Sequence, residues 1–275
     1  MSKSLFQRIM VAVVFVPVIL IILYVLPPVA MAAALAVICA IALYEALVAT
    51  DFLKHSRIAF YSMLLAAAIP FWAWSGSEGR LVLPALFVYV VLLFAEAIGS
   101  RQKMGLEKMG GAFFLAVFIP YFLSSLIRLR RLEHWQFLVM LPFVIAFMSD
   151  TFAYFTGRVL GKHKMAPDLS PKKTVEGAVG GLLGATVFSM LWGTMFHLAF
   201  HLEGVQYPAM ALYGALGSVV SQLGDLSFSY IKREYGIKDF GNLLPGHGGI
   251  LDRFDSVIFC APFVELMLYF LPVVK

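Results

Sequence analysis

The chain has 275 residues, of which 61% are hydrophobic and only 13% are charged, and its formal net charge is +5. About a quarter of the residues in a soluble domain are charged, so this composition excludes an ordinary soluble protein. Long uncharged runs recur along the sequence, which indicates membrane-spanning helices, whereas a β-barrel would show short alternating strands. No basic run is interleaved with aromatic residues, so we expect no nucleic-acid partner.

Nine apolar segments of about 20 residues follow one another, and each is long enough to cross a bilayer. The first is too long for the apolar core of a signal peptide, so we interpret it as a retained helix. We predict an all-α polytopic integral membrane protein in which residues 1–134 form a scaffold of about five helices and residues 135–275 form the catalytic region. The predicted spans are 9–26, 29–47, 58–74, 81–98, 111–126, 135–155, 178–200, 209–230 and 257–273.

Lysine and arginine predict the orientation, because these residues concentrate on cytoplasmic segments. With a cytoplasmic N-terminus, 16 of the 21 basic residues lie on the cytoplasmic side and 5 on the other. The cluster Arg128-Arg130-Arg131 is the one group that conflicts with this orientation. The polar loops 158–177 and 231–255 would then face the cytoplasm, and we expect a site at that face of the cell membrane.

Two aspartates lie at membrane depth, where a charge is costly and usually functional or paired. Asp150 and Asp225 each precede the cytoplasmic end of a span by seven or eight residues, so both lie about 10–12 Å below that surface. Each belongs to a polar stripe at helical spacing, which predicts a water-filled cavity or, alternatively, an interhelical hydrogen-bond seam. The stripes are Asp150, Tyr154 and Arg158, and Ser221, Asp225, Ser229 and Lys232. Glu45 and Glu96 lie near helix ends, where an interfacial and a functional interpretation are equally open.

The two loops supply residues for phosphate and metal binding. Lys172 and Lys173, beside hydroxyls at the start of a helix, could hold a phosphate, although lysines at this membrane face also follow from orientation alone. In the second loop the run from Pro245 to Gly249 predicts a backbone anion site. Asp252 and Asp255, together with Asp225, form an oxygen-rich set that suits Mg²⁺, although helix capping could account for one of them. A site of this kind at membrane depth predicts phosphoryl or nucleotidyl transfer onto a lipid.

Three sequence motifs resemble those of the phosphatidate cytidylyltransferases, also called CDP-diacylglycerol synthases. The most specific is Ser229-x-Ile231-Lys232-Arg233, Lys238-Asp239-x-Gly241 and Leu244-Pro245-x-His247-Gly248-Gly249-Ile250-x-Asp252-Arg253-Phe254-Asp255. The others are Ser149-Asp150-Thr151 with Ala153-Tyr154 and Gly157-Arg158, and Ser170-Pro171-Lys172-Lys173-Thr174 with Glu176-Gly177. The resemblance covers the chain from about residue 140; the first five spans match only in hydropathy.

The resemblance implies a homodimeric membrane enzyme that makes CDP-diacylglycerol and pyrophosphate from CTP and phosphatidate. It implies Mg²⁺ held by Asp225, Asp252 and Asp255, with a monovalent cation such as K⁺ beside it. We place Lys238 and Asp239 with these aspartates among the catalytic residues. The expected substrate-binding residues are Asp150, Ser170, Lys172, Lys173, Thr174, Glu176, Ser229, Lys232, Arg233, His247, Gly248, Gly249 and Arg253.

Two other functions fit parts of the pattern. A related lipid cytidylyltransferase or a polyprenol kinase would use the same kind of cavity on another lipid. An ion or phosphate transporter would use Asp150 and Asp225 as its intramembrane site, but such proteins often carry repeats, and none is visible here.

Overall fold

A computed structural model describes residues 13, 15–51, 56–99, 105–244 and 248–275 of the chain. Over these residues the fold is helical apart from one two-stranded hairpin, which confirms the predicted all-α class. The elements are η1 (Ile21–Val25, a π-helix), α2 (Pro28–Ala49), α3 (Ser56–Ser75), α4 (Glu78–Gly99), α5 (Leu106–Leu123), α6 (Ser125–Arg130), α7 (Trp135–Leu138), α8 (Leu141–Leu160), β1 (Lys164–Ala166), β2 (Ser170–Thr174), α9 (Val175–Phe200), α10 (Tyr207–Glu234) and α11 (Leu251–Phe270).

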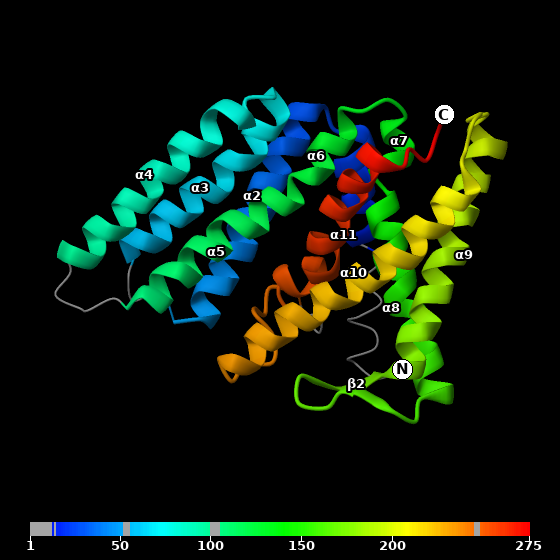
Figure 1. The fold of residues 1–275 in the computed structure, drawn as a ribbon. Coiled ribbons are helices and arrows are strands. Elements are labelled where there is room, and N and C mark those ends of the chain that lie inside the picture. Colours follow the sequence, from blue (N-terminus) through cyan, green and yellow to red (C-terminus); the bar gives the residue numbers. More distant parts are fainter. Residues whose placement is uncertain (1–12, 14, 52–55, 100–104, 245–247) are drawn as a thin grey trace. The chain divides into compact units, whose positions relative to one another are not determined.

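The chain divides into two compact units. The N-terminal unit comprises Met1–Arg128 and Tyr235–Phe254, and the C-terminal unit comprises Leu129–Glu234 and Asp255–Lys275. Within the N-terminal unit α3 packs against α2, α4 and α5, and these four helices can be followed in blue to green in Figure 1. Within the C-terminal unit α8 packs along α9, and α10 contacts both. The stretch from 235 to 254, which carries much of the longest motif, therefore belongs with the N-terminal helices.

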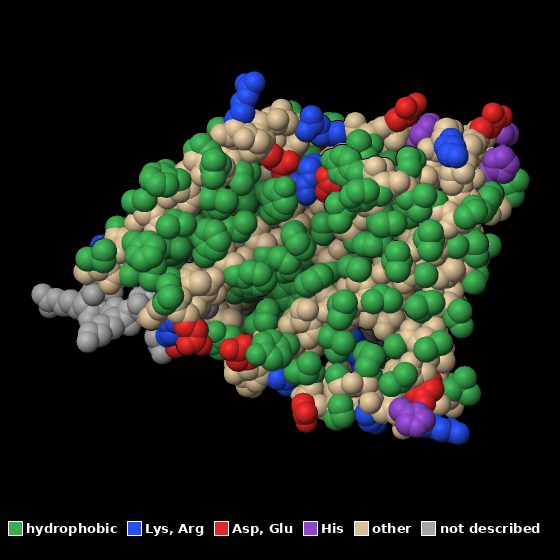
Figure 2. Space-filling view, in the orientation of Figure 1, with side chains coloured by type: hydrophobic (Ala, Val, Ile, Leu, Met, Phe, Trp, Pro, Cys, Tyr) green, Lys and Arg blue, Asp and Glu red, His purple; other side chains and the backbone are tan. Residues whose placement is uncertain are grey.

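Six of the described helical segments are long and apolar enough to cross a membrane. Their side chains cover the surface, as the exposed face of α4 illustrates with Leu83, Phe87 and Ile98. Figure 2 shows hydrophobic side chains over the flanks of the helices and charged ones toward the helix ends. The chain is therefore a membrane protein. The six segments are Pro28–Ala49, Arg57–Ser75, Glu78–Gly99, Leu106–Arg130, Trp135–Leu160 and Val175–Phe200.

The count of nine spans stays a prediction. The first predicted span, 9–26, lies partly outside the described residues, which include an apolar helical segment at Phe15–Val25. Helices α10 and α11 correspond in position to the eighth and ninth predicted spans, but they are not among the six apolar segments.

Helix ends follow the turn signals in the sequence. Pro27 caps α2 and Pro28 occupies its first position, where proline needs no hydrogen-bond partner for its nitrogen. Gly76, with a φ of 72°, lies in the turn between α3 and α4. The fifth span was predicted as one helix over 111–126. In the structure α5 ends at Leu123, the chain is interrupted at Ser124, four residues after Pro120, and the helix resumes as α6.

Two arginines of the cluster that conflicted with the orientation have partners within the chain. Arg128 donates to Glu78 Oε1 at 2.8 Å, and its guanidinium lies 4.7 Å from the centre of the Tyr121 ring. In the C-terminal unit, the guanidinium of Arg130 lies 4.8 Å from the ring centre of Trp135. An ion pair and an aromatic contact therefore explain why Arg128 lies here, and an aromatic contact explains Arg130, without reference to the orientation.

Candidate active site

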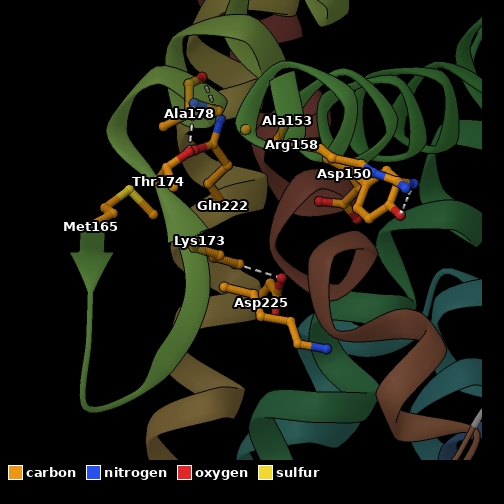
Figure 3. Close-up of a pocket in the computed structure, with 13 residues that line it drawn as sticks. Asp150, Ala153, Arg158, Met165, Lys173, Thr174, Ala178, Gln222 and Asp225 are labelled. Atoms are coloured by element: carbon orange, nitrogen blue, oxygen red, sulfur yellow. Dashed lines mark hydrogen bonds and ion pairs between the residues drawn. The ribbon is translucent and has the colours of Figure 1, made fainter. Parts of the chain in front are cut away.

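A cavity of about 590 Å³ in the C-terminal unit is lined by residues of two of the three motifs, together with Asp225, which lies four residues before the longest motif (Figure 3). Asp150 reaches it from α8 and Asp225 from α10, so the prediction that these two aspartates share a cavity is confirmed. Lys172 and Lys173 reach it from β2. The other lining residues are Ala153, Tyr154, Gly157, Arg158, Met165, Thr174, Gly177, Ala178 and Gln222.

Lys173 and Asp225 form an ion pair at the wall of this cavity. The distance from Lys173 Nζ to Asp225 Oδ2 is 2.5 Å, and the two side chains are 24% and 25% exposed. Ser229, one turn further along α10, donates a hydrogen bond to Asp225 Oδ1 at 3.4 Å. Lys172, the neighbour of Lys173, is exposed. With Arg158, the cavity wall holds three bases and two acids, a balance that favours an anionic ligand.

A second group of charges surrounds Asp150. Arg158 lies near Asp150 in Figure 3 and donates to the Tyr154 hydroxyl at 3.2 Å. Ser256 at the start of α11 donates to Asp150 Oδ2 at 3.3 Å. Asp255 is half-buried and lies within electrostatic reach of Asp225, Asp150 and the buried Lys232. The C-terminal unit therefore gathers three aspartates, with Lys173 and Lys232 as their neighbouring cations.

The predicted Mg²⁺ ligands are divided between the two units. Asp225 and Asp255 belong to the C-terminal unit and Asp252 to the N-terminal unit. Among the described residues, no three acidic, histidine or cysteine side chains are grouped to hold a metal ion. Mg²⁺ usually needs only one or two protein carboxylates beside water and substrate phosphates, and the Lys173 ammonium already occupies a cation's position at Asp225. Asp225 and Asp255 offer the kind of ligands that Mg²⁺ takes, and the binding of Mg²⁺, like the set of three aspartates, stays a prediction.

The hairpin β1–β2 holds the two lysines at the cavity, and its strands were not predicted from the sequence. The strands are antiparallel, with Lys164 opposite Thr174 and Ala166 opposite Ser170. Strands this short carry too little periodicity to be recognised in a polar loop.

Thr174 and Glu176, which we predicted to bind substrate, make contacts that fix the hairpin to α9. Thr174 caps α9 by accepting the amide of Gly177 at 3.1 Å. The Glu176 carboxylate accepts the amides of Lys162 and His163 and contacts His163 Nδ1 at 2.6 Å, which closes the base of the hairpin. A role for either residue in substrate binding stays a prediction.

A hydrogen-bond seam runs beside the cavity, and it is formed by other residues of α8, α9 and α10 rather than by the stripe residues themselves. Ser149 of α8 and Ser218 of α10 are hydrogen bonded at 2.7 Å between their hydroxyl oxygens. Gln222 donates to Ser218 Oγ at 3.0 Å and to the Ala178 carbonyl at 3.2 Å, and it also lines the cavity. The sequence analysis did not include Gln222. The i, i+4 spacing of Ser218 and Gln222, two polar residues in the predicted eighth span, could have indicated it.

In the N-terminal unit, Asp252 binds backbone amides of its own loop. It is 6% exposed, and its Oδ2 accepts the amides of Phe240 at 2.9 Å and Gly249 at 3.0 Å. Gly248 has a φ of 83°, a conformation that favours glycine, and a Cβ there would lie 2.9 Å from Asp252 Oδ2. The Gly249 amide, expected to bind phosphate, is thus satisfied within the chain.

The other predicted residues of this stretch are placed as follows. Lys238 and Asp239 are exposed in the N-terminal unit. Arg233, in the C-terminal unit, donates to the Leu169 carbonyl at 3.2 Å, which links the end of α10 to the hairpin loop. Arg253 is half-buried, and His247 lies outside the described residues. Their roles with substrate stay predictions.

Comparison with known proteins extends the resemblance to nearly the whole chain. Residues 6–271 match the Cytidylyltransferase family, so the match includes the N-terminal helices. A phosphatidate cytidylyltransferase of Bacillus subtilis (strain 168) is 38% identical over 185 residues, which are 67% of this chain and 66% of that protein. One from Thermotoga maritima is 31% identical over 74% of both chains, and one from Rickettsia conorii is 34% identical over 68% of this chain and 82% of its own length. The chain therefore belongs to the cytidylyltransferase family.

Proposed function

We propose that this chain catalyses the transfer of a cytidylyl group from CTP to phosphatidate, which yields CDP-diacylglycerol and pyrophosphate. The observation that carries the proposal is the family match over residues 6–271, which includes every motif residue around the cavity. The relatives with 31–38% identity described above carry the name of this activity.

The chemistry needs charge neutralisation more than proton transfer. A phosphatidate oxygen, already anionic at neutral pH, forms a bond to the α-phosphorus of CTP, and the bond from that phosphorus to the pyrophosphate oxygen breaks. The barrier comes mainly from repulsion between anions and from charge developing on pyrophosphate, which preorganised cations counter. Lys172, Lys173 and Arg158 at the cavity wall are suited to this task.

Within this proposal Mg²⁺ would be held by Asp225 and Asp255, with Asp252 and a monovalent cation as further members of the centre. The bound metal would neutralise charge on the phosphates of CTP and the leaving pyrophosphate. The pair with Lys173 keeps Asp225 beside a positive charge and holds Lys173 at the cavity wall.

The proposal also includes the arrangement in the cell. Nine spans, a cytoplasmic N-terminus and a cavity open to the cytoplasm would give CTP access to a phosphatidate still anchored in the cell membrane. The excess of lysine and arginine on the loops that contain the motifs supports this orientation. We expect the enzyme to act as a homodimer.

A turnover assay with the purified full chain tests the proposal. Radiolabelled CTP and phosphatidate in mixed micelles should give labelled CDP-diacylglycerol, chelation should stop the reaction, and added Mg²⁺ should restore it. A polyprenol and an ether-linked phosphatidate analogue serve as competing acceptors. Turnover of either in preference to phosphatidate, or the absence of any CTP-dependent product, would refute the proposed reaction.

A further inference from the structure

Glu45 is a buried carboxylate near the end of α2 that the cavity does not use. The residue is 6% exposed, although it lies in a membrane-spanning helix where a charge needs a partner. Both carboxylate oxygens accept backbone amides from the start of α11. Oε1 accepts the amide of Ile250 at 3.0 Å, and Oε2 accepts the amide of Leu251 at 2.9 Å.

We propose that Glu45 is a positioning residue for the proposed reaction, and that it fixes the backbone of residues 249–251 at the start of α11 so that Asp252 keeps its place. This inference rests on the proposed function only in that Asp252 is taken to serve that reaction. All of the residues concerned belong to the N-terminal unit.

The geometry is that of a helix cap supplied by a different helix. The first amides of an α-helix have no partner within it, and a carboxylate at this end also meets the positive end of the helix dipole. A capping residue normally lies next to the helix in sequence, but here the donors lie 205 and 206 residues from Glu45. An interfacial glutamate reaching for water would not bring both oxygens onto backbone amides.

Two glycines, Gly241 and Gly249, leave the space that the Glu45 carboxylate fills. A Cβ added to Gly241 would overlap the Glu45 carboxylate at Oε1, and a Cβ added to Gly249 would overlap it at Oε2. Two glycines of the motif therefore enclose Glu45 from two sides. Any larger residue at either position would push the carboxylate away from the amides that it binds.

Glu45 and Asp252 act on adjacent parts of the same backbone. Asp252 accepts the amide of Gly249, and Glu45 accepts those of Ile250 and Leu251, so three consecutive amides are bound by two carboxylates. If Glu45 is lost, two of these amides lose their partner at the residues that immediately precede Asp252. A shift of about 1 Å in a catalytic group can lower the rate about 100-fold.

The first experiment compares Glu45→Gln with Glu96→Gln as a matched control. Glu96 is another glutamate of a membrane-spanning helix in the same unit, and it pairs with Arg57 at 3.6 Å. We expect Glu45→Gln to lower kcat about 100-fold and to leave KM for CTP within about twofold, because the lysines of the cavity are untouched. Glu96→Gln should retain wild-type kcat. A Glu45→Gln enzyme with wild-type kcat, or one changed in KM alone, would refute the inference.

A double variant separates positioning from general damage to the fold. Glu45→Asp withdraws the carboxylate by one methylene, which makes room for the methyl group of Gly249→Ala. The combined variant should therefore have at least about 5-fold more activity than the product of the two single effects predicts, because contacting residues couple. A double variant whose activity equals the product of the two single effects would show that Glu45 and Gly249 are not in contact.

Hydrogen exchange gives an answer that does not depend on turnover. In Glu45→Gln the peptide containing Ile250 and Leu251 should exchange at least about 10-fold faster than in wild type, whereas peptides of α8 and α9 should be unchanged. If wild type makes no CDP-diacylglycerol, the proposed function fails, and the exchange result alone decides on Glu45. An exchange rate at this peptide equal to that of wild type would overturn the inference. If Glu45→Gln does not fold, the same measurement is made on Glu45→Asp.

Discussion

Removing the charge of Lys173 should destabilise the protein, whereas removing that of Lys172 should not. Lys173 Nζ lies 2.5 Å from Asp225 Oδ2, and both side chains are about three-quarters buried. A hydrogen bond to a charged group contributes about 1.5–3 kcal/mol, and partial exposure screens the pair toward the lower end, about 1.5–2 kcal/mol. At about 2–4 °C per kcal/mol, Lys173→Met should lower the melting temperature by about 3–8 °C.

The measurement is thermal unfolding of the purified variants, with Lys172→Met as the matched control. Lys172 is exposed on the same strand, so its variant should melt within about 1 °C of wild type. Its loss should appear in turnover, as a KM for CTP raised about 10-fold, the equivalent of one charge-assisted contact of about 1.4 kcal/mol.

A double variant tests the cause. If Lys173→Met destabilises by leaving the Asp225 carboxylate without its cation, then adding Asp225→Asn should restore part of the melting temperature, because the uncompensated charge is gone. Two outcomes would refute this reasoning. One is an equal decrease in melting temperature for Lys172→Met and Lys173→Met, and the other is a double variant whose decrease equals the sum of the decreases of Lys173→Met and Asp225→Asn.

Three further predictions concern the hairpin and the orientation. Thr174→Ala removes the cap of α9 and should cost about 1 kcal/mol in thermal unfolding, with Thr174→Ser close to wild type. Gly177→Ala would place a Cβ 2.8 Å from the Ala153 carbonyl oxygen, so it should cost about 1–3 kcal/mol by the same measurement, whereas Gly79→Ala, which meets no neighbour, should cost less than about 0.5 kcal/mol. A cysteine at exposed Asp168 should react with a membrane-impermeant thiol reagent from the cytoplasmic side, since Cys39 and Cys260 are buried; labelling from the opposite side alone would overturn the orientation.

Much of the fold could be predicted from local patterns. Runs of apolar residues located the helices, and the turns at Pro27-Pro28 and Gly76 fall between the predicted spans. Helical spacing also predicted that Asp150 and Asp225 share a cavity, and the cavity contains both. These predictions succeeded because each depends on a few neighbouring residues or on the constant rise of a helix.

The rest depends on contacts between distant segments, which no local pattern encodes. Glu45 could be recognised as a charge near a helix end, but its partners lie more than 200 residues away. In the same way, nothing in the sequence showed that residues 235–254 would group with the N-terminal helices, or that a polar loop would form the hairpin that carries Lys172 and Lys173. The site is therefore less predictable than the helices around it.

The contact between Glu45 and α11 has a consequence for biosynthesis. At about 5–20 residues per second, a ribosome needs about 10–40 s to make the 205 residues that separate Glu45 from Ile250. During this interval α2 has entered the membrane with a carboxylate whose amide partners do not yet exist. The N-terminal helices can insert early, but their unit is completed only when α11 is made. A ribosome that stalls before this point would leave an inserted intermediate with an unsatisfied charge, which membrane quality control could recognise.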